Sequence, residues 1–302
     1  MSRELRLGLV GLGRWGRVLA ANVADLPGVT LAAIATGKTE APVPRCLLRP
    51  HWRDLLELGL DGLLIASPPA SHAAIARAAL ARGMALFVEK PLTLDAAEAA
   101  ALAEAAEDAD GLVMVDHIHL FSPAFRTLKA LAGPIRRMEG RAGNHGPYRQ
   151  DAGVLWDWGP HDVAMMIDLM DTAPDQAKAE MVERRAMGDG IGETIRLDLG
   201  FGAAEGSATL STLTDKCRSL TVECADGTLL VYDDVGPVRL SRRPPGGEAE
   251  PVECGPERPL QVALGEFAQA IRTGSRERSG LRLGRQVVEV LGRCQSSLGG
   301  AP

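Results

Sequence analysis

The stretch Leu5–Gly16, LRLGLVGLGRWG, decides the fold of this chain. Its apolar first half predicts a buried β-strand over Leu5–Val10. The glycines that follow, Gly11, Gly13 and Gly16, form the pattern G-x-G-x-x-G and are followed by a predicted helix. A strand, a glycine turn and a helix in this order hold a dinucleotide pyrophosphate, because the free N–H groups of the helix N-terminus face the phosphates. The alternative is a glycine-rich turn without a ligand.

Strands and helices alternate up to about residue 116. Further apolar strands are predicted at Val29–Ala35, Gly62–Ala66, Met84–Val88 and Leu112–Val115, and helices at Trp15–Leu26, Trp52–Leu58, Ser71–Arg82 (with Ser71 as N-cap) and Asp95–Asp108. Apolar strands that alternate with helices indicate a parallel sheet covered on both faces. We therefore expect an α/β fold that begins with a doubly wound, Rossmann-type dinucleotide-binding domain over residues 1–118.

The pattern changes after about residue 134. A strand (Pro134–Arg141) and a helix (Gly159–Met170) precede polar/apolar strands at Ala177–Arg185, Thr194–Gly200, Gly206–Thr214, Ser219–Cys224 and Thr228–Tyr232, and helices at Leu260–Arg272 and Leu283–Arg293 close the chain. Polar and apolar residues that alternate along each strand, with turn signals between the strands, predict an antiparallel sheet. Residues 119–302 are therefore expected to form a second α/β domain with a mainly antiparallel sheet, whose closing helices can pack back on the first domain.

Composition excludes several classes of protein. The chain has 302 residues and a net charge of −6, which argues against a nucleic-acid-binding scaffold. No apolar run approaches the ~20 residues of a membrane span, and the N-terminus has no signal-peptide core. The five cysteines are scattered, without the spacing of a zinc site or a disulfide framework, so we expect a reducing cytoplasm and no metal.

The end of the second strand bears on the choice of cofactor. NAD-binding folds often place an acid there for the ribose hydroxyls, whereas this strand ends in Ala-Thr-Gly-Lys, with Thr36 and Lys38. A hydroxyl and an ammonium group would bind a 2′-phosphate that a carboxylate repels, so NADP is favoured over NAD. The alternative for Lys38 is a solvated loop lysine. Arg14 is a candidate to cover the adenine or its phosphate, or a surface arginine.

Two segments carry candidate acid–base chemistry. Lys90, in the strand-end sequence Phe87–Pro91, stands where ligands bind in open α/β sheets and can polarise a substrate oxygen; alternatively it pairs with Glu89. The Lys90–Pro91 bond is a candidate for the cis isomer. Asp157 and His161 are four residues apart at a helix start, with Pro160 expected at the first helical position. They form either an acid–base unit or a helix cap followed by a packed histidine, and Asp162 is expected to turn away.

These segments together carry a family resemblance. The glycine loop, Ala66-Ser67-Pro68-Pro69 with His72, Glu89-Lys90-Pro91, and Asp157 with His161 occur in a familiar order, and the chain resembles the Gfo/Idh/MocA oxidoreductases over nearly its whole length. The resemblance implies a Rossmann domain, a second domain whose large open sheet often mediates oligomers, and hydride transfer to or from sugars and polyols. It places Lys90, Asp157 and His161 at the catalytic positions. The implied cofactor contacts are Gly11, Gly13, Arg14, Trp15, Gly16, Thr36, Lys38, Ser67, Pro68, His72, Glu89 and Lys90.

Position alone suggests substrate contacts. His117 follows the last Rossmann strand together with His119, and Asn144, His145, Tyr148 and Arg149 precede the Asp157 segment. For each of them a structural or surface role is the alternative. The segment 39–50 is short and rich in proline where relatives usually have a helix and a strand, so the resemblance does not define the adenine-side wall of the cofactor pocket.

The sequence thus predicts an NADP(H)- or NAD(H)-dependent oxidoreductase. Its expected substrate is a secondary alcohol or ketone of a sugar, polyol or nucleotide-sugar-like molecule, with His161 as the acid–base group, Lys90 polarising the oxygen and Asp157 positioning both. A homo-oligomer, dimer or tetramer, through the C-terminal sheet is expected. The alternatives are a glycosidase that uses NAD for a transient oxidation, and a dinucleotide sensor without enzymatic activity.

Overall fold

The chain divides into two compact units. The structure is a computed structural model that describes residues 3–146, 148, 153–188 and 190–299. The first unit contains residues 1–118 and 258–288, and the second contains residues 119–257 and 289–302. The first unit is therefore built from two stretches of chain that are far apart in the sequence.

A six-stranded parallel sheet forms the centre of the first unit, in the order β3-β2-β1-β4-β5-β6. The strands are β1 (Leu5–Val10), β2 (Val29–Ala35), β3 (Leu47–Arg49), β4 (Gly62–Ile65), β5 (Ala85–Glu89) and β6 (Val113–Asp116). Each neighbouring pair runs parallel. Their carboxyl ends therefore share one edge, where open α/β sheets bind ligands.

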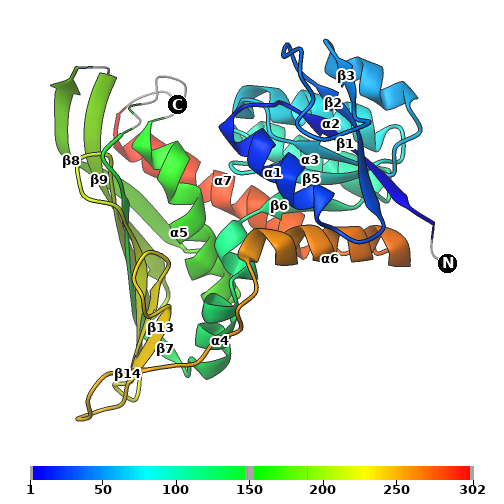
Figure 1. Ribbon diagram of the computed structural model, residues 1–302. Helices are drawn as coiled ribbons and strands as arrows, with labels where there is room; N and C mark the ends of the chain where they lie inside the picture. The colour runs from blue at the N-terminus through cyan, green and yellow to red at the C-terminus, as the bar shows by residue number, and fades with distance from the viewer. Residues whose placement is uncertain (1–2, 147, 149–152, 189, 300–302) are drawn as a thin grey trace. The chain divides into compact units, whose positions relative to one another are not determined.

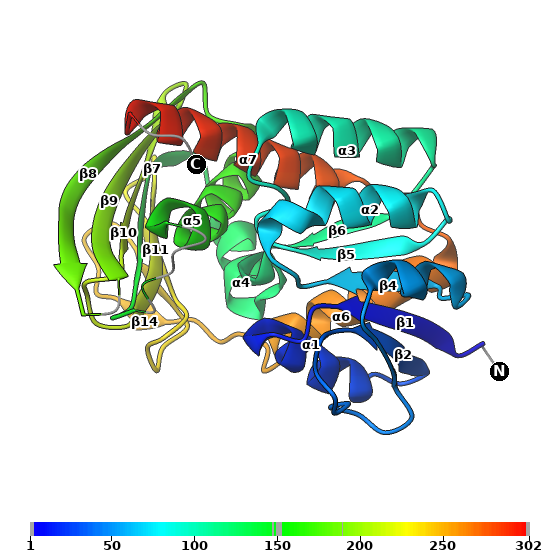
Figure 2. The ribbon, with the colours of Figure 1, turned by 90° about the horizontal axis from the view of Figure 1, so that it is seen from above.

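Helices cover both faces of this sheet. They are α1 (Arg14–Ala24), α2 (His72–Leu80), α3 (Ala96–Asp108), α6 (Pro259–Thr273) and the first half of α7 (Ser279–Ser297), with the 3-10 turns η1 (Trp52–Glu57) and η2 (Pro69–Ser71). Helices α2 and α3 lie side by side on one face (Figure 2), and α1 packs with α6 on the other. The Phe87 and Phe267 rings, 5.6 Å apart, join β5 to α6. The apolar strands are therefore buried, as continuous apolar runs require.

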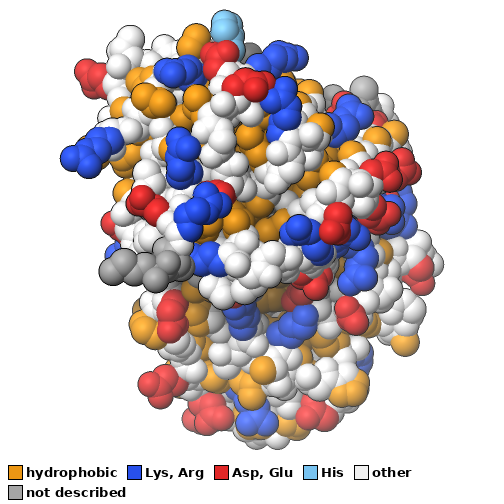
Figure 3. Space-filling model, turned by 90° about the vertical axis from the view of Figure 1, so that its right-hand side faces the viewer, with side chains coloured by type: hydrophobic (Ala, Val, Ile, Leu, Met, Phe, Trp, Pro, Cys, Tyr) orange, Lys and Arg blue, Asp and Glu red, His pale blue; other side chains and the backbone are white. Residues whose placement is uncertain are grey.

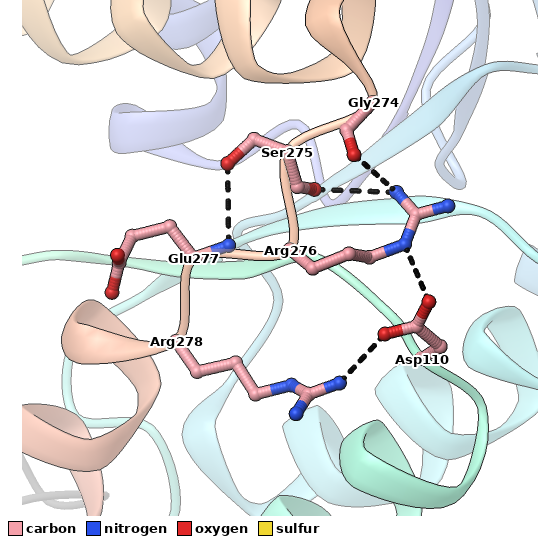
Figure 4. Close-up of polar contacts among 6 residues, drawn as sticks. All are labelled: Asp110, Gly274, Ser275, Arg276, Glu277 and Arg278. Atoms are coloured by element: carbon pink, nitrogen blue, oxygen red, sulfur yellow. Dashed lines mark hydrogen bonds and ion pairs between the residues drawn. The ribbon is translucent and has the colours of Figure 1, made fainter.

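The closing segment is tied to the first unit by a charged cluster as well. Asp110, in the turn between α3 and β6, accepts hydrogen bonds from Arg276 Nε at 3.1 Å and from Arg278 at 2.8 Å (Figure 4). The Arg276 guanidinium also donates to the carbonyl oxygens of Gly274 and Ser275. The connection between α6 and α7 is therefore anchored to the turn before β6. All these side chains are largely exposed, so each pair stabilises the unit only modestly.

An eight-stranded sheet organises the second unit, in the order β14-β13-β12-β11-β7-β10-β9-β8. Its strands are β7 (Ile135–Gly143), β8 (Gln176–Met187), β9 (Gly190–Phe201), β10 (Ala204–Ser211), β11 (Cys217–Cys224), β12 (Leu229–Asp233), β13 (Leu240–Arg243) and β14 (Glu250–Pro251). All neighbours are antiparallel except β7 and β10, which are parallel. The expected two-part α/β architecture is confirmed.

One face of this sheet is covered by α4 (Pro123–Leu131), which follows η3 (Ile118–Phe121), and by α5 (Val154–Met170) (Figure 1). The side chains of Leu197, Leu210 and Leu220 point to this face and are wholly buried. Along the opposite face polar and charged side chains stand in register, for example Arg137 beside Glu205. The alternation in the sequence therefore separates a packed face from a polar one.

Several local predictions were wrong. Helix α5 begins at Val154 after Gly153, so Pro160 lies inside the helix and not at its first position. Ser71 precedes α2 but does not cap it with its side chain, because its hydroxyl donates to the Pro68 carbonyl oxygen. The segment 39–50 does contain a strand, β3, which pairs with β2. Helix α4 and strands β13 and β14 were not predicted.

The surface shown in Figure 3 carries acidic and basic side chains interspersed with hydrophobic ones. Charges of both signs are thus mixed on this face, in keeping with a net charge of only −6. Among the described helices, none combines the length and the apolar character needed to cross a lipid bilayer.

Candidate functional site

The glycine loop has the shape of a phosphate cradle. Gly11 has a φ of +94°, and a Cβ there would lie 2.6 Å from the Ala66 carbonyl oxygen. A Cβ at Gly16 would overlap the Gly11 carbonyl. Both positions therefore require glycine, which brings α1 close to β1 and β4.

Gly13 differs, because a Cβ built there meets no described atom within 4 Å. It is the N-cap of α1, and no side chain caps the helix. The first N–H groups of α1 consequently face open space, where the partial positive charge of the helix end favours an anion. This arrangement fits a dinucleotide pyrophosphate. Arg14 and Trp15 begin α1 and are exposed.

The end of β2 is polar and carries no carboxylate. The Thr36 hydroxyl accepts a hydrogen bond from the Lys38 backbone N–H at 3.1 Å, which fixes the turn, and the Lys38 side chain is exposed. Arg49, at the end of β3, pairs in register with Ala35. A second cation thus stands beside the strand end, and the sequence reasoning missed it because β3 was not predicted.

His72 ties together two loops at the carboxyl edge of the sheet. Its Nδ1 lies 3.0 Å from the Pro91 carbonyl oxygen and its Nε2 lies 2.9 Å from the Ser67 carbonyl oxygen. The ring is wholly buried, and burial lowers its pKa against the opposing effect of these carbonyls. His72 therefore links the loop that follows β4 to the loop that follows β5. The Lys90–Pro91 bond is cis, as expected.

Two buried carboxyl groups stand beside Lys90. Glu89 and Asp116 end β5 and β6 and pair in register. Burial and the neighbouring Asp116 raise the pKa of Glu89 well above its usual range. Burial raises the pKa of Asp116 to about 6, although Glu89 and Lys90 oppose the shift. The two buried carboxyl groups therefore resist being ionised together, with the Lys90 ammonium as the nearby positive charge.

The second unit places Asp157 and His161 one turn apart on α5. Both are partly exposed. The His161 ring packs edge to face against His119, with ring centroids 4.9 Å apart and an interplanar angle of 83°. His119 Nδ1 lies 2.9 Å from the Tyr232 hydroxyl. The candidate acid–base residue is thus supported by a second imidazole and a buried phenol.

Asp162, the residue after His161, turns into the core. Its carboxylate accepts a hydrogen bond from Arg218 at 2.6 Å, and the two side chains are 0% and 6% exposed. The Arg218 guanidinium also lies over the Trp158 ring, 5.2 Å from its centroid. This buried ion pair fixes the helix against β11 directly behind the candidate histidine.

Comparison with known proteins identifies the family. Residues 5–117 match the model of the Gfo/Idh/MocA oxidoreductase family with an NAD-binding Rossmann fold. A crystal structure of a protein classed as an oxidoreductase, from Magnetospirillum magnetotacticum MS-1, is 39% identical and superposes with a TM-score of 0.90, covering 96% of this chain and 99% of that one. The chain belongs to the Gfo/Idh/MocA family.

Curated relatives match shorter stretches of the chain. UDP-N-acetylglucosamine 3-dehydrogenase of Acidithiobacillus ferrooxidans is 30% identical over 181 residues, which is 58% of either chain. The NAD⁺-dependent scyllo-inositol 2-dehydrogenase of Bacillus subtilis is 31% identical over 138 residues, 43% of this chain and 40% of that protein. The match therefore spans about two fifths to three fifths of these relatives.

The predicted substrate contacts of this family member occupy different environments. His117 is 2% exposed, and burial with the nearby Lys90 charge lowers its pKa to about 3. Asn144 and Tyr148 are partly buried, whereas His145 is exposed with Nε2 3.4 Å from Asp215. Arg149 lies outside the described residues. Among the described side chains, no group of three or more His, Cys, Asp or Glu is placed to hold a metal ion.

Besides Arg49, four residues of these sites were not predicted as site residues: Asp116, Arg218, Tyr232 and Asp162 in its ion-paired role. A signal existed for Asp116, because it ends an apolar strand at the edge of the sheet where Glu89 also stands. Asp162, Arg218 and Tyr232 lie far apart in the sequence, and only the pairing of β11 and β12 under α5 brings them near one another.

Proposed function

We propose that the protein is an NADP(H)-dependent oxidoreductase that interconverts a secondary alcohol and a ketone on a sugar, polyol or nucleotide-sugar-like substrate. The observation that carries the proposal is the placement of Lys90 at the same sheet edge as the uncapped glycine loop. When bound, the dinucleotide supplies or accepts the hydride. The names of the matched sugar and inositol dehydrogenases support the substrate class.

The roles follow from the chemistry of each side chain. His161 takes the hydroxyl proton in oxidation and returns it in reduction, because an imidazole titrates near neutral pH. Lys90 donates a hydrogen bond to the reacting oxygen and stabilises the charge that develops on it. Asp157, one turn before His161, positions the histidine and the substrate. The candidate contacts to substrate hydroxyls are Asn144, His145, Tyr148 and the deeply buried His117.

The first experiment measures turnover on a panel of sugars, polyols and nucleotide sugars at the nicotinamide absorbance. The variants K90M and H161N are expected to lower turnover about 10²–10⁴-fold while NADPH binding changes little. A matched control is H51N, the same substitution on an exposed ring to which no site role is assigned. Unchanged turnover in both K90M and H161N contradicts the assignment. Cofactor retained without net reduction favours the glycosidase, and binding without turnover favours the sensor.

Preference for NADP is proposed from the end of β2. Thr36, Lys38 and Arg49 offer a hydroxyl and two cations, and a 2′-phosphate binds such groups through charge-assisted hydrogen bonds. Fluorescence titration is expected to give a lower Kd for NADPH than for NADH. The variant K38Q should weaken NADPH binding about tenfold and leave NADH binding unchanged. The control K178Q, in the second unit, should alter neither, and equal loss for both dinucleotides in K38Q would contradict the proposal.

The polar face of the eight-stranded sheet is proposed as a homo-oligomer interface. Opposite charges alternate along it, as in Arg196 beside Asp198, and a hollow of about 690 Å³ lies over β7–β10. Such a surface is complementary to a second copy of itself. Light scattering after gel filtration is expected to give a dimer or tetramer that R196E shifts toward monomer. We also propose the reducing cytoplasm as the compartment of the protein, from its five unpaired cysteines.

A further inference from the structure

The carboxyl ends of β5 and β6 carry a cluster of buried polar side chains that the proposed chemistry uses only in part. Glu89 and Asp116 end these strands in register and are 8% and 1% exposed. His117 follows Asp116 and is also buried. One oxygen of Glu89, both oxygens of Asp116 and both ring nitrogens of His117 have no hydrogen-bond partner among the described residues. Ions are costly to bury in this way, so the charge on the cluster depends on what lies beside it.

The two carboxyl groups resist ionising together because of where the strands end. Residues in register on neighbouring strands lie about 5 Å apart, and a buried position screens their repulsion poorly. The charges that act on the pair are Lys90 and, within the pair, each carboxyl group on the other. One ammonium group balances one carboxylate, and the second carboxyl group therefore favours its neutral form. An additional positive charge at this edge would help that group to release its proton.

The other groups around the pair keep their charge near neutral pH or carry none. Burial lowers the pKa of His117 to about 3, and burial also lowers the pKa of His72 on α2. Helices α6 and α7 pack against β5 and β6 through Phe267 and Gly284. Burial raises the pKa of Asp116 to about 6, so among these groups the carboxyl pair is the one that titrates near neutral pH.

The strand order assigns the pair to one half of a dinucleotide. The order β3-β2-β1-β4-β5-β6 is that of two mononucleotide-binding halves, which meet between β1 and β4. The uncapped start of α1 follows β1 and suits the pyrophosphate, and the cations beside the end of β2 suit the adenosine side. The nicotinamide side then belongs to β4–β6, where Glu89 and Asp116 stand. An oxidised nicotinamide ring carries a positive charge, whereas the reduced ring is neutral.

We propose that the Glu89–Asp116 pair couples a proton to the redox state of the bound dinucleotide: the pair releases a proton to the solvent when the oxidised form binds and keeps it when the reduced form binds. The charged ring replaces the proton as the balancing charge, and a neutral ring does not. By linkage, the released proton weakens binding of the oxidised form at low pH. Acidic conditions thus favour the reduced dinucleotide in the site. The inference rests on the proposed binding of a nicotinamide dinucleotide.

Equilibrium binding measures this coupling without turnover. Kd values are determined with the full chain from pH 5.5 to 8 for the oxidised and reduced forms of the dinucleotide that binds more tightly, NADP(H) or NAD(H). The ratio of the two Kd values is followed, because the 2′-phosphate of NADP(H) titrates in both forms and cancels. If the charged ring lowers a pKa of about 6 by about one unit, the ratio of oxidised to reduced Kd is about threefold larger at pH 5.5 than at pH 8. A ratio that stays constant overturns the proposal.

Calorimetry counts the released proton directly. Titrations at pH 5.5 in two buffers of different ionisation enthalpy give the number of protons released for each dinucleotide bound. The same shift predicts that the oxidised form releases about half a proton more than the reduced form. Equal release by the two forms contradicts the coupling.

Three variants locate the proton. E89Q/D116N removes both titrating carboxyl groups with little change in shape, so its Kd ratio should not vary with pH. D108N, at an exposed acid that ends α3, should behave as the wild type. H161N removes the imidazole of the proposed acid–base role, and the pH dependence of the ratio should remain. A dependence that survives in E89Q/D116N, or that disappears in H161N, assigns the proton to another group and overturns the proposal. The wild-type ratio decides on its own where the double variant does not fold.

The outcomes separate this inference from the proposed function. A constant Kd ratio in an enzyme whose turnover needs Lys90 and His161 refutes the coupling and leaves the oxidoreductase in place. A pH-dependent ratio that E89Q/D116N abolishes supports the coupling even where K90M and H161N keep full turnover, which refutes the acid–base roles. Binding of neither dinucleotide form refutes both.

Discussion

Replacing Asp162 by asparagine should cost the second unit a large part of its stability. The Asp162 carboxylate lies 2.6 Å from Arg218, and the two side chains are 0% and 6% exposed. The amide keeps the shape of the side chain but leaves a buried guanidinium without its counter-charge, which costs about 3–5 kcal/mol. Asp168 on the same helix offers a matched control, because its 2.9 Å pair with Lys129 is 28% and 46% exposed and should be worth about 0–1 kcal/mol.

Urea unfolding followed by circular dichroism measures both variants. For a unit of about 150 residues, the loss predicted for D162N corresponds to a melting point lowered by roughly 10 °C. The double variant D162N/R218M should be less destabilised than the sum of the two single variants, because it removes both charges together. Equal unfolding free energies for D162N and D168N would refute the reasoning.

Three further outcomes are expected. D95A should destabilise the first unit by about 1 kcal/mol in urea unfolding, because the Asp95 carboxylate caps α3 by accepting from the Glu98 N–H at 2.9 Å. G11A should cost about 2 kcal/mol or more by the same assay, since a Cβ would meet the Ala66 carbonyl at a positive φ. For Asp116 the folded pKa is raised, so its ionisation costs stability as pH rises from its ordinary value of 3.8 through about 6. The unfolding free energy of D116N should therefore rise relative to that of the wild type over this pH range. A difference between the two proteins that stays constant with pH would contradict this expectation.

The regular elements of the first unit were predictable because local pattern and tertiary environment agree there. The strands over Leu5–Val10 and Val29–Ala35 match the predicted ranges residue for residue. A strand of a parallel sheet is buried on both faces, so a continuous apolar run marks it directly. Helix α5 shows the limit. Its apolar residues pack against the sheet from Val154 onward, and that tertiary packing outweighs the preference of Pro160 for a helix start.

The site was predictable only in part, for a related reason. Glycine loops and strand ends are local signals, and they pointed to Gly11, Lys90 and Glu89. The partners of these side chains come from remote strands, as Tyr232 contacts His119 across 113 residues of sequence. A single sequence carries no signal for such pairings until the order of the strands is known.

The split of the first unit into two stretches of chain has a consequence for biosynthesis. When Ile118 leaves the ribosome, all six strands of the parallel sheet exist, but the Phe87 side of the sheet still lacks the helix that brings Phe267. At about 5–20 residues per second, synthesis needs roughly ten to thirty seconds to deliver that helix. During this interval the apolar face of the nascent sheet is exposed. The faster the remaining chain is translated, the shorter the time for which chaperones must protect this face.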